Sequence, residues 1–397
     1  MREAVIVEAV RSPIGKRNGS LSGTHPVDLL AHVLQAMVER SGVDPGLIED
    51  NITGCVSQVG EQSINIGRNG WLAARFPEEI PSTTVDRQCG SSQQAAHFAA
   101  QGVIAGAYDL VVASGVENKT RVPMGSSMAG AMPYSPALFN RYEGKLVPQG
   151  ISAELIATKW DLSREQLDDF SARSHARAAG ATKEGRFQRE IAPIKVSGED
   201  GEKLLDVDEG IRFELDREKM GTLQPSFFNP GLEDQFPGQL NWRITAANSS
   251  QISDGAAAVL IASREKAEEL GLKPRARFVS FGLAGVDPRL MLHGNPQASE
   301  RALARAGLGW DDMAVIEVNE AFASVALQFL RDAGLEERVG DVNPNGGGIS
   351  LGHPLGATGA RITATLLNEV ERRDGRYGLA TMCIGFGQAI AAVIERV

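Results

Sequence analysis

The sequence contains few cysteines and no long apolar run. Its three cysteines, Cys55, Cys89 and Cys383, are odd in number and far apart in 397 residues, which argues against a disulfide framework and for a reduced compartment. No segment approaches the ~18 apolar residues of a membrane span. The short apolar run in MREAVIVEAVRS reads as a buried first strand, and not as a charged region followed by the apolar core of a signal peptide. We therefore expect a cytoplasmic protein without a membrane partner.

Positive charge is also scarce. The chain has 40 Lys and Arg against 50 Asp and Glu, for a formal net charge of -10 at pH 7. Such a chain offers no broad basic surface to nucleic acid or to an anionic membrane. No CxxC or HxxxH pair predicts a metal site, and the nucleotide-binding patterns GxxxxGK[ST] and GxGxxG are absent. An anionic ligand must therefore find a local positive site.

Glycine, by contrast, is abundant, with 44 residues, and short apolar strands alternate with helical stretches. The rhythm runs through AVIVEAV, residues 27–41, NITGCVSQV and DLVVASG, and it returns after residue 244 in DGAAAVLIAS, ARFVSFGLAG and MAVIEVNEAF. Between them the chain is rich in Met, Pro, Gly and charge, with one helix predicted from the capping box SREQ at Ser163 to about Gly180. The pattern predicts an α/β protein of two similar halves, residues 1–120 (completed by about 244–270) and 271–397, with an inserted loop domain over 121–243.

The stretch VDRQCGSSQQA places Cys89 at a predicted turn from a strand into a helix. At such a turn, free backbone N–H groups and the positive end of the helix dipole lower a thiol pKa from ~8.5 toward neutrality. Cys89 is therefore a candidate nucleophile. The alternative is a small buried side chain, which is the commoner fate of a free cysteine, so a catalytic Cys89 requires partners.

Three further turns supply candidate partners. In NPNGGGISLGHPLGATGAR, glycines and Pro354 fix His353, which can take a thiol proton; a phosphate-binding loop or a purely structural turn histidine are the alternatives. In TMCIGFGQA, Cys383 ends an apolar run and offers a second acid/base group. Asn319 closes the strand in VIEVNEAFAS, where its amide can donate to an oxyanion.

Together these four segments resemble the thiolases, and the resemblance runs nearly end to end. EAVRSPIGK, SHARAA with GRFQREIAPI, and NSSQISDGAAAV are also similar to thiolase segments and occur in the expected order. The version DRQCGSSQQA is most similar to degradative thiolases of actinobacteria that act on bulky acyl-CoAs such as steroid side chains or rings. The resemblance implies a five-layered αβαβα fold built from two similar halves.

The resemblance also implies a role for each residue at these turns. Cys89 matches the nucleophile that takes the acyl group as a thioester, and His353 matches the base that activates it. Cys383 matches the group that protonates the departing enolate. Asn319, acting with a water and His353, matches one oxyanion hole, and the backbone N–H groups of Cys89 and Gly385 match the other.

Coenzyme A is implied as a substrate, and no tightly bound cofactor or metal is expected. Ser250 matches a serine near the pantetheine of coenzyme A. Arg217, Lys219 and Arg243 are candidates for its phosphates, with surface charge as the alternative for each. His293 is a candidate for a contact near bound coenzyme A.

Several positions depart from the family pattern. Asp86 stands where Asn is common, and a carboxylate there is expected to disfavour the Cys89 thiolate unless Arg87 offsets it. Gln149 lies in the segment that usually lines the acyl pocket. Phe386, in CIGFG, replaces a glycine and is expected to reshape the pocket beside Cys383. These departures leave the chemistry in place and bear on substrate choice.

The predicted activity is cleavage of a 3-ketoacyl-CoA by free CoA into acetyl-CoA and a shortened acyl-CoA, as in β-oxidation of fatty or steroid-derived chains. One alternative is a biosynthetic thiolase that forms acetoacetyl-CoA, and another is an acyl-CoA binding protein without catalysis. A ketoacyl synthase is disfavoured, because its usual pair of histidines is missing and Cys383 is present. The family further implies a homodimer or homotetramer.

Overall fold

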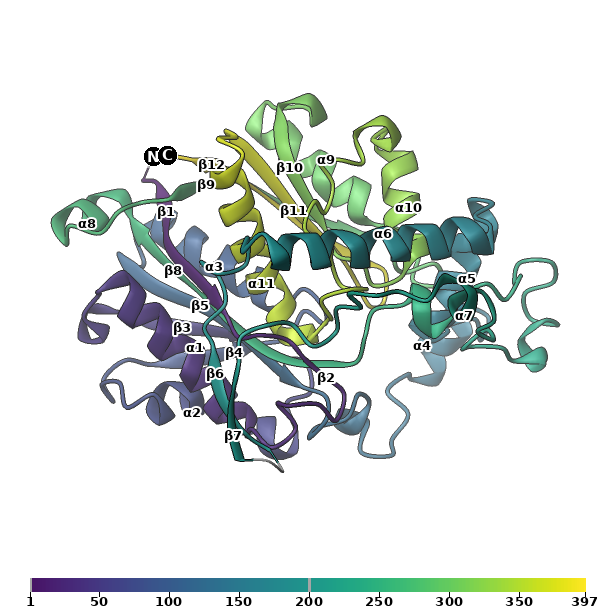
Figure 1. The fold of residues 1–397 in the computed structure, drawn as a ribbon, viewed down its shortest axis with the longest axis horizontal. Coiled ribbons are helices and arrows are strands. Elements are labelled where there is room, and N and C mark those ends of the chain that lie inside the picture. The colour runs from purple at the N-terminus through teal and green to yellow at the C-terminus, as the bar shows by residue number, and fades with distance from the viewer. Residues whose placement is uncertain (1, 199–200) are drawn as a thin grey trace.

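The structure is a computed structural model that describes residues 2–198 and 201–397. Its centre is a sheet with the strand order β10-β11-β12-β9-β1-β8-β5-β3-β4, and β2 pairs with β8 at one side. The first part of the chain contributes β1 (Ala4–Arg11), β2 (Gly15–Lys16), β3 (Asp50–Gly54), β4 (Ser82–Val85), β5 (Leu110–Asn118) and β8 (Ser253–Ser263). The last part contributes β9 (Ala276–Gly285), β10 (Met313–Val318), β11 (Tyr377–Ile384) and β12 (Gln388–Arg396). Figure 1 shows the two groups of strands, purple to green and green to yellow, as separate fans.

The two fans join along a short seam. There, β1 and β9 pair antiparallel through Val5 with Arg277 and Ile6 with Ala276. Within the fans, β3–β4, β3–β5 and β10–β11 are parallel, whereas β1–β8, β5–β8, β11–β12 and β9–β12 are antiparallel. Each fan is therefore a mixed sheet with its own hydrogen-bond ladder.

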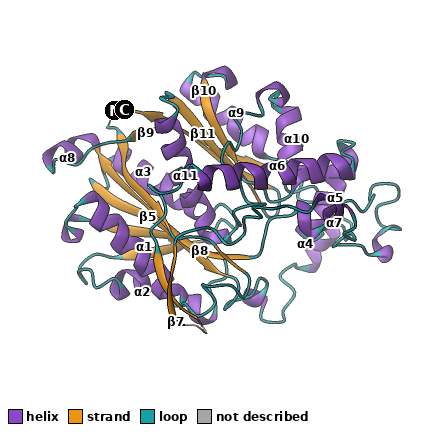
Figure 2. Cartoon of the chain, viewed as in Figure 1, coloured by secondary structure: helices purple, strands orange, loops and turns teal. Residues whose placement is uncertain are grey.

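Three layers of helices cover the faces of the two fans (Figure 2). The first fan is covered on its outer face by α1 (Pro26–Ser41) and α2 (Ile66–Ala73), with α8 (Arg264–Glu269) at its end. The second fan is covered on its outer face by α9 (Asn295–Ala306) and α10 (Ala323–Asp332). Between the fans lie α3 (Ser91–Ala105) and α11 (Leu355–Arg372), which share one core with both sheets. This arrangement confirms the predicted five-layered αβαβα fold.

Alternation along the strands explains why the sequence reads as continuous apolar runs. In β8, Val259 and Ile261 face the middle helices, whereas Ala258 and Leu260 face the outer layer with α1. A strand whose two faces are both covered has no polar side, since successive side chains point to opposite faces. The same alternation sets the faces of β11 and β12.

Glycines allow the two middle helices to pack closely. A Cβ atom added at Gly359 of α11 would lie 2.1 Å from the backbone nitrogen of Gln93 in α3, and one added at Gly54 would lie 2.2 Å from that of Ser92. Only residues without a side chain fit at such distances. Part of the glycine abundance therefore sets the spacing of the middle layer.

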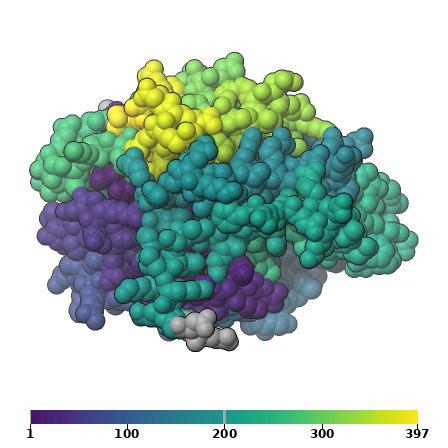
Figure 3. Space-filling view, in the orientation of Figure 1, coloured from purple at the N-terminus to yellow at the C-terminus, as the bar shows by residue number. Residues whose placement is uncertain are grey.

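The segment between β5 and β8 crosses one face of the molecule, seen in teal in Figure 3. It carries α4 (Pro136–Arg141), α5 (Gln149–Lys159), α6 (Arg164–Lys183), the hairpin β6 (Ile194–Gly198) with β7 (Gly201–Leu205), and α7 (Arg217–Gly221). The predicted capping box is present, because the Ser163 hydroxyl accepts from the backbone of Gln166 and the Gln166 amide accepts from Ser163. No helix in the described part of the chain has the length and apolar character to cross a membrane.

Candidate active site

Cys89 occupies the turn that leads from β4 into α3, as the sequence predicts, and is 2% exposed. The turn is tight: Gln88 has a φ of 47°, in the left-handed region that few non-glycine residues adopt. Asp86 stabilises this conformation, since its carboxylate accepts a hydrogen bond of 2.6 Å from the backbone N–H of Gln88. Asp86 is itself exposed, so its carboxylate acts on the backbone of the turn rather than on the buried sulfur.

The groups around the Cys89 sulfur shift the pKa of its thiol in opposite directions. Burial raises the pKa of the thiol, and the charge of Lys119, the Gln149 amide and the backbone N–H groups of Gly385 and Cys89 act in the opposite direction. The Gln149 Nε2 atom, at the start of α5, lies 3.9 Å from Sγ. The expected lowering of the Cys89 pKa is therefore wrong for the free protein, because burial outweighs the helix terminus. Cys89 rests as a thiol and requires a base.

His353 is held in a defined tautomer. Its Nδ1 atom lies 2.6 Å from the Thr358 hydroxyl, which donates its own proton to the carbonyl of Pro354 at 2.8 Å. Nδ1 must then donate to Thr358, and Nε2 carries the lone pair. Burial, followed by the charges of Lys119 and Arg361, lowers the pKa of His353 well below its ordinary value. The network thus keeps a neutral imidazole with a basic Nε2.

Asn319 faces this lone pair from the end of β10. Its Nδ2 atom lies 3.3 Å from His353 Nε2, while its Oδ1 atom is buried without a hydrogen-bond partner. The neighbouring Glu320 is buried and accepts from Ser174, Asn343 and the backbone N–H of Ile349. Glu320 therefore ties the end of β10 to the glycine-rich segment before His353. An orphaned Oδ1 in such a place is suited to hold a water.

Cys383 ends β11 beside the same turn. Burial, and then the charge that Cys89 carries when ionised, raise the pKa of Cys383, so it stays a thiol able to donate a proton. Phe386, which is expected to reshape the pocket beside Cys383, follows three residues later. Phe386 has a φ of 62°, is 46% exposed and packs edge-on against Tyr134, with 5.7 Å between ring centroids. Its ring thus meets the inserted segment at the surface.

A cavity of about 450 Å³ opens between α6, α7 and the segment before β8. Lys219 lines it together with His175, Arg212, Gln251 and residues 246–247. Ser250 precedes Gln251 and is anchored by its backbone N–H to the carbonyl of Ala321, two residues after Asn319. This cavity therefore adjoins the segment that carries the site.

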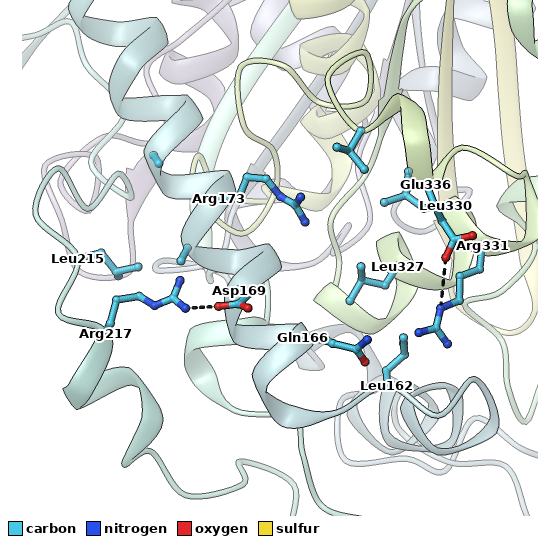
Figure 4. Close-up of a pocket in the computed structure, with 13 residues that line it drawn as sticks. Leu162, Gln166, Asp169, Arg173, Leu215, Arg217, Leu327, Leu330, Arg331 and Glu336 are labelled. Atoms are coloured by element: carbon cyan, nitrogen blue, oxygen red, sulfur yellow. Dashed lines mark hydrogen bonds and ion pairs between the residues drawn. The ribbon is translucent and has the colours of Figure 1, made fainter.

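The other predicted coenzyme A contacts lie elsewhere. Arg217 lines a neighbouring cavity of about 810 Å³ between α6 and α10 and pairs there with Asp169 (Figure 4). Arg243 donates to the carbonyl of Leu162 at 2.5 Å. His293 packs against Trp160, with 6.2 Å between ring centroids. Only Lys219 of the four thus lines the cavity next to Ser250.

Sequence reasoning missed one charged residue of this site. Lys119 lies just beyond β5, is 6% exposed, and donates a hydrogen bond of 2.8 Å from Nζ to the backbone carbonyl of His353. The signal in the sequence was slight, because ENKTR reads as the polar end of a strand. Among the described residues, no group of three or more His, Cys, Asp or Glu side chains is placed to hold a metal ion.

The fold and the site define an acyltransferase, and comparison with known proteins identifies which one. Residues 4–265 match the family Thiolase, N-terminal domain, and residues 272–396 match Thiolase, C-terminal domain. The chain belongs to the thiolase family, which confirms the family predicted from the sequence.

Two curated relatives illustrate the match. The chain is 45% identical to the steroid 3-ketoacyl-CoA thiolase FadA6 of Mycobacterium tuberculosis, over all of this chain and 95% of that protein. It is also 45% identical to the 3-ketoacyl-CoA thiolase of Vibrio parahaemolyticus, over all of this chain and 98% of that protein. Among solved structures, the acetyl-CoA acetyltransferase of Bacillus anthracis superposes with a TM-score of 0.88 at 35% identity, covering 100% of this chain and 99% of that one.

Proposed function

We propose that the protein is a degradative 3-ketoacyl-CoA thiolase, which cleaves a 3-ketoacyl-CoA with CoA into acetyl-CoA and a shortened acyl-CoA. The observation that carries the proposal is the convergence on one sulfur. The backbone N–H groups of Gly385 and Cys89 lower the pKa of the Cys89 thiol, and the charge of an ionised Cys89 raises the pKa of Cys383. A nucleophile, a proton donor and a pair of oxyanion donors are the groups that this reaction requires.

In the first half of the reaction, His353 Nε2 takes the proton of Cys89 while Sγ attacks the C3 carbonyl carbon of the substrate. The electron pair of the carbonyl moves to its oxygen, which the N–H groups of Cys89 and Gly385 receive. When the carbonyl reforms, the C2–C3 bond breaks and its electron pair remains on C2 as an enolate. Cys383 gives its proton to C2, which releases acetyl-CoA and leaves an acyl-thioester on Cys89.

Asn319 has a part in the same step. The enolate oxygen needs donors, and a water held by the unpartnered Oδ1 of Asn319 can donate to it together with the protonated Nε2 of His353. Both donors are buried, where a hydrogen bond to a developing charge is stronger than in water.

In the second half, the thiol of free CoA gives its proton to the Cys383 thiolate and attacks the acyl-thioester. The tetrahedral intermediate expels Cys89 as a thiolate, which recovers its proton from His353. Cys89, His353 and Cys383 thus regain their starting protonation states, with the proton of the CoA thiol replacing the one that Cys383 gave to C2. The products are acetyl-CoA and the shortened acyl-CoA. The residues themselves supply the acid, the base and the nucleophile for each step.

For coenzyme A, we propose the cavity lined by Lys219 and Gln251. Its volume of about 450 Å³, and its lining by Gln251, the residue after Ser250, support a pantetheine arm that extends from this cavity toward Cys89. Lys219 is exposed at this cavity and offers a positive charge to a phosphate. We keep Arg217 and His293 as weaker candidates, since neither lines this cavity.

For the acyl group, the similarity to a relative named steroid 3-ketoacyl-CoA thiolase supports a bulky substrate, and the similarity to relatives named 3-ketoacyl-CoA thiolase supports fatty chains. Gln149, whose amide faces Cys89, and the exposed pair of Phe386 and Tyr134 are the residues that we propose influence the choice. A homodimer or homotetramer remains our prediction, and the free side of the edge strand β4 is one surface suited to it.

The test is the intact mass of the protein after mixing with a 3-ketoacyl-CoA in the absence of free CoA, followed by peptide mapping. We expect an acyl adduct on Cys89 whose mass reports the acyl group, in the wild type and in the control Cys55→Ala but not in Cys89→Ala. An adduct with a steroid-derived substrate and none with acetoacetyl-CoA would assign the bulky substrate.

Two alternatives predict different outcomes. A binding protein without catalysis would form no adduct with any substrate while its Cys89 thiol stays free. A biosynthetic enzyme would form the adduct but favour condensation, so the rates of thiolysis and condensation must be compared on the same preparation. The acetyl-CoA acetyltransferase fold neighbour makes this second comparison worthwhile.

A further inference from the structure

Lys119 is a buried lysine with an unusual set of contacts. Its ammonium donates to the backbone carbonyl of His353 at 2.8 Å, and no carboxylate in residues 2–198 or 201–397 forms an ion pair with it within 4.0 Å. A buried cation is normally paired, because removing its hydration is unfavourable unless a counter-charge replaces the water. A lysine buried without such a pair calls for another explanation.

The nearest carboxylates are engaged elsewhere. Glu117 of β5 accepts from the backbone N–H groups of Val56, Ser57 and Gly356 and from the amide of Gln62. Asp254 of β8 accepts from the backbone and the hydroxyl of Thr120. Burial lowers the pKa of Lys119, and Glu117, the Cys89 sulfur and Asp254 act in the opposite direction. Neither carboxylate binds the ammonium.

What remains near Lys119 is the reacting pair. Its ammonium donates a hydrogen bond of 2.8 Å to the main-chain carbonyl of His353. The charge of Lys119 also favours the ionised form of the Cys89 thiol. The other titratable or charged groups facing this cluster are Cys383 from β11, Arg361 from α11, and the carboxylates of Glu117 and Asp254.

We propose that Lys119 is a positioning residue that serves as the counter-charge of the Cys89 thiolate. The hydrogen bond to the His353 carbonyl fixes the ammonium, and its positive charge stabilises the negative sulfur that forms when the thiol proton leaves. This inference rests on the proposed role of Cys89 as the nucleophile and adds the group that offsets its burial.

The pKa shifts agree with this geometry in sign. After burial, which raises the pKa of Cys89, the charge of Lys119 is the largest opposing influence on that thiol. The same charge helps to lower the pKa of His353 and so favours the neutral imidazole. The first effect stabilises the thiolate, and the second keeps His353 neutral until it accepts the thiol proton. Removing the charge should therefore move the ionisation of Cys89 to higher pH.

The experiment measures the rate at which iodoacetamide alkylates Cys89 between pH 6 and 10.5, followed by peptide mapping and without any substrate. The variant Lys119→Gln keeps a donor for the His353 carbonyl but has no charge, and Lys119→Met has neither. We expect both variants to alkylate about tenfold more slowly than the wild type at pH 8, with the midpoint of the rate profile shifted upward by about one pH unit.

A purely structural role predicts another pattern. If Lys119 only tethers the His353 turn, Lys119→Gln should alkylate like the wild type, and folded Lys119→Met should keep the wild-type midpoint. Either result would overturn the proposal, and thermal unfolding of both variants reports whether they are folded. Since no acyl-CoA is used, the outcome is separate from that of the acyl-adduct test: Cys89 can fail to acylate and still show the Lys119-dependent midpoint.

Discussion

Two buried cations of this protein lie in opposite kinds of surroundings. Arg11, at the end of β1, is fully buried and donates to Glu190 at 2.7 Å and to both oxygens of Asp208 at 2.6 and 2.9 Å, with the Phe187 ring against its guanidinium. Lys119 is almost as buried but donates to a backbone carbonyl.

The difference separates charges that hold the fold from charges placed at the reaction. The Arg11 cluster is complete: Glu190 also accepts from Thr365, and Asp208 also accepts from the backbone of Ile14. Each charged side chain of the Arg11 cluster has its partners within the protein, so none is left for a ligand. The cluster also connects β1 to the inserted segment and to α11. The cluster around Cys89 is incomplete. Among the described residues, no carboxylate forms an ion pair with Lys119 within 4.0 Å, and Asn319 Oδ1 has no hydrogen-bond donor. An incomplete cluster can be completed by a thiolate or by a substrate.

The largest expected effect tests the reaction side of this contrast. We expect Cys383→Ala to lower kcat for thiolysis by about 10²–10⁴-fold, because the enolate loses its proton donor. The free energy of unfolding in urea should change little in comparison. Cys55→Ala, a second buried thiol outside the site, is the matched control, and equal losses of kcat in both variants would contradict the assignment.

The next effect tests the structural side. Arg11→Met leaves Glu190 and Asp208 buried without their partner, so we expect the free energy of unfolding to fall by about 3–5 kcal/mol. The exposed pair of Arg396 and Asp374 provides the control, and Arg396→Met should cost less than about 1 kcal/mol. If Arg11→Met kept its free energy of unfolding but lost kcat, the structural role of the Arg11 cluster would be contradicted.

A smaller effect compares two buried histidines. His97 in α3 packs on the Phe281 ring at 4.7 Å, its ring nitrogens have no hydrogen-bond partner, and burial followed by the charge of Arg87 lowers its pKa to about 3. Below pH 6.5 the unfolded chain binds a proton there that the folded chain does not. Stability contributed by a neutral His97 is therefore complete above pH 6.5 and is lost as the pH falls toward 3, by about 1.4 kcal/mol per pH unit.

Urea unfolding of His97→Phe between pH 6 and 4 checks this sign. As the pH falls, the free energy of unfolding of His97→Phe should decrease less steeply than that of the wild type, by up to about 1.4 kcal/mol per pH unit. The control Phe281→Leu keeps His97. Its free energy of unfolding should lie below that of the wild type by the same amount at every pH. Parallel curves for the wild type and His97→Phe would show that His97 is protonated in the folded protein.

The sequence allowed the layers to be predicted and the candidate site residues to be placed at turns, because both depend on local patterns. β9 begins and ends where ARFVSFGLAG does, and Cys89 and His353 follow from residues within a few positions of each. Lys119 could not be predicted in this way, since its partner lies 234 residues away and its neighbours in the sequence are polar. Arg217 and Lys219 show the same limit. They are two residues apart on one short helix, yet they line different cavities.

The middle layer has a consequence for synthesis of the chain. It holds one helix from early in the sequence, α3, and one from near its end, α11, and α11 also covers β5 and β8. Until α11 has left the ribosome, the inner face of the first sheet is only partly covered and Cys89 lacks the histidine that precedes α11. The nascent first half is therefore an aggregation-prone intermediate, and Cys89, the nucleophile that we propose, meets His353, its proposed base, only when translation is nearly complete.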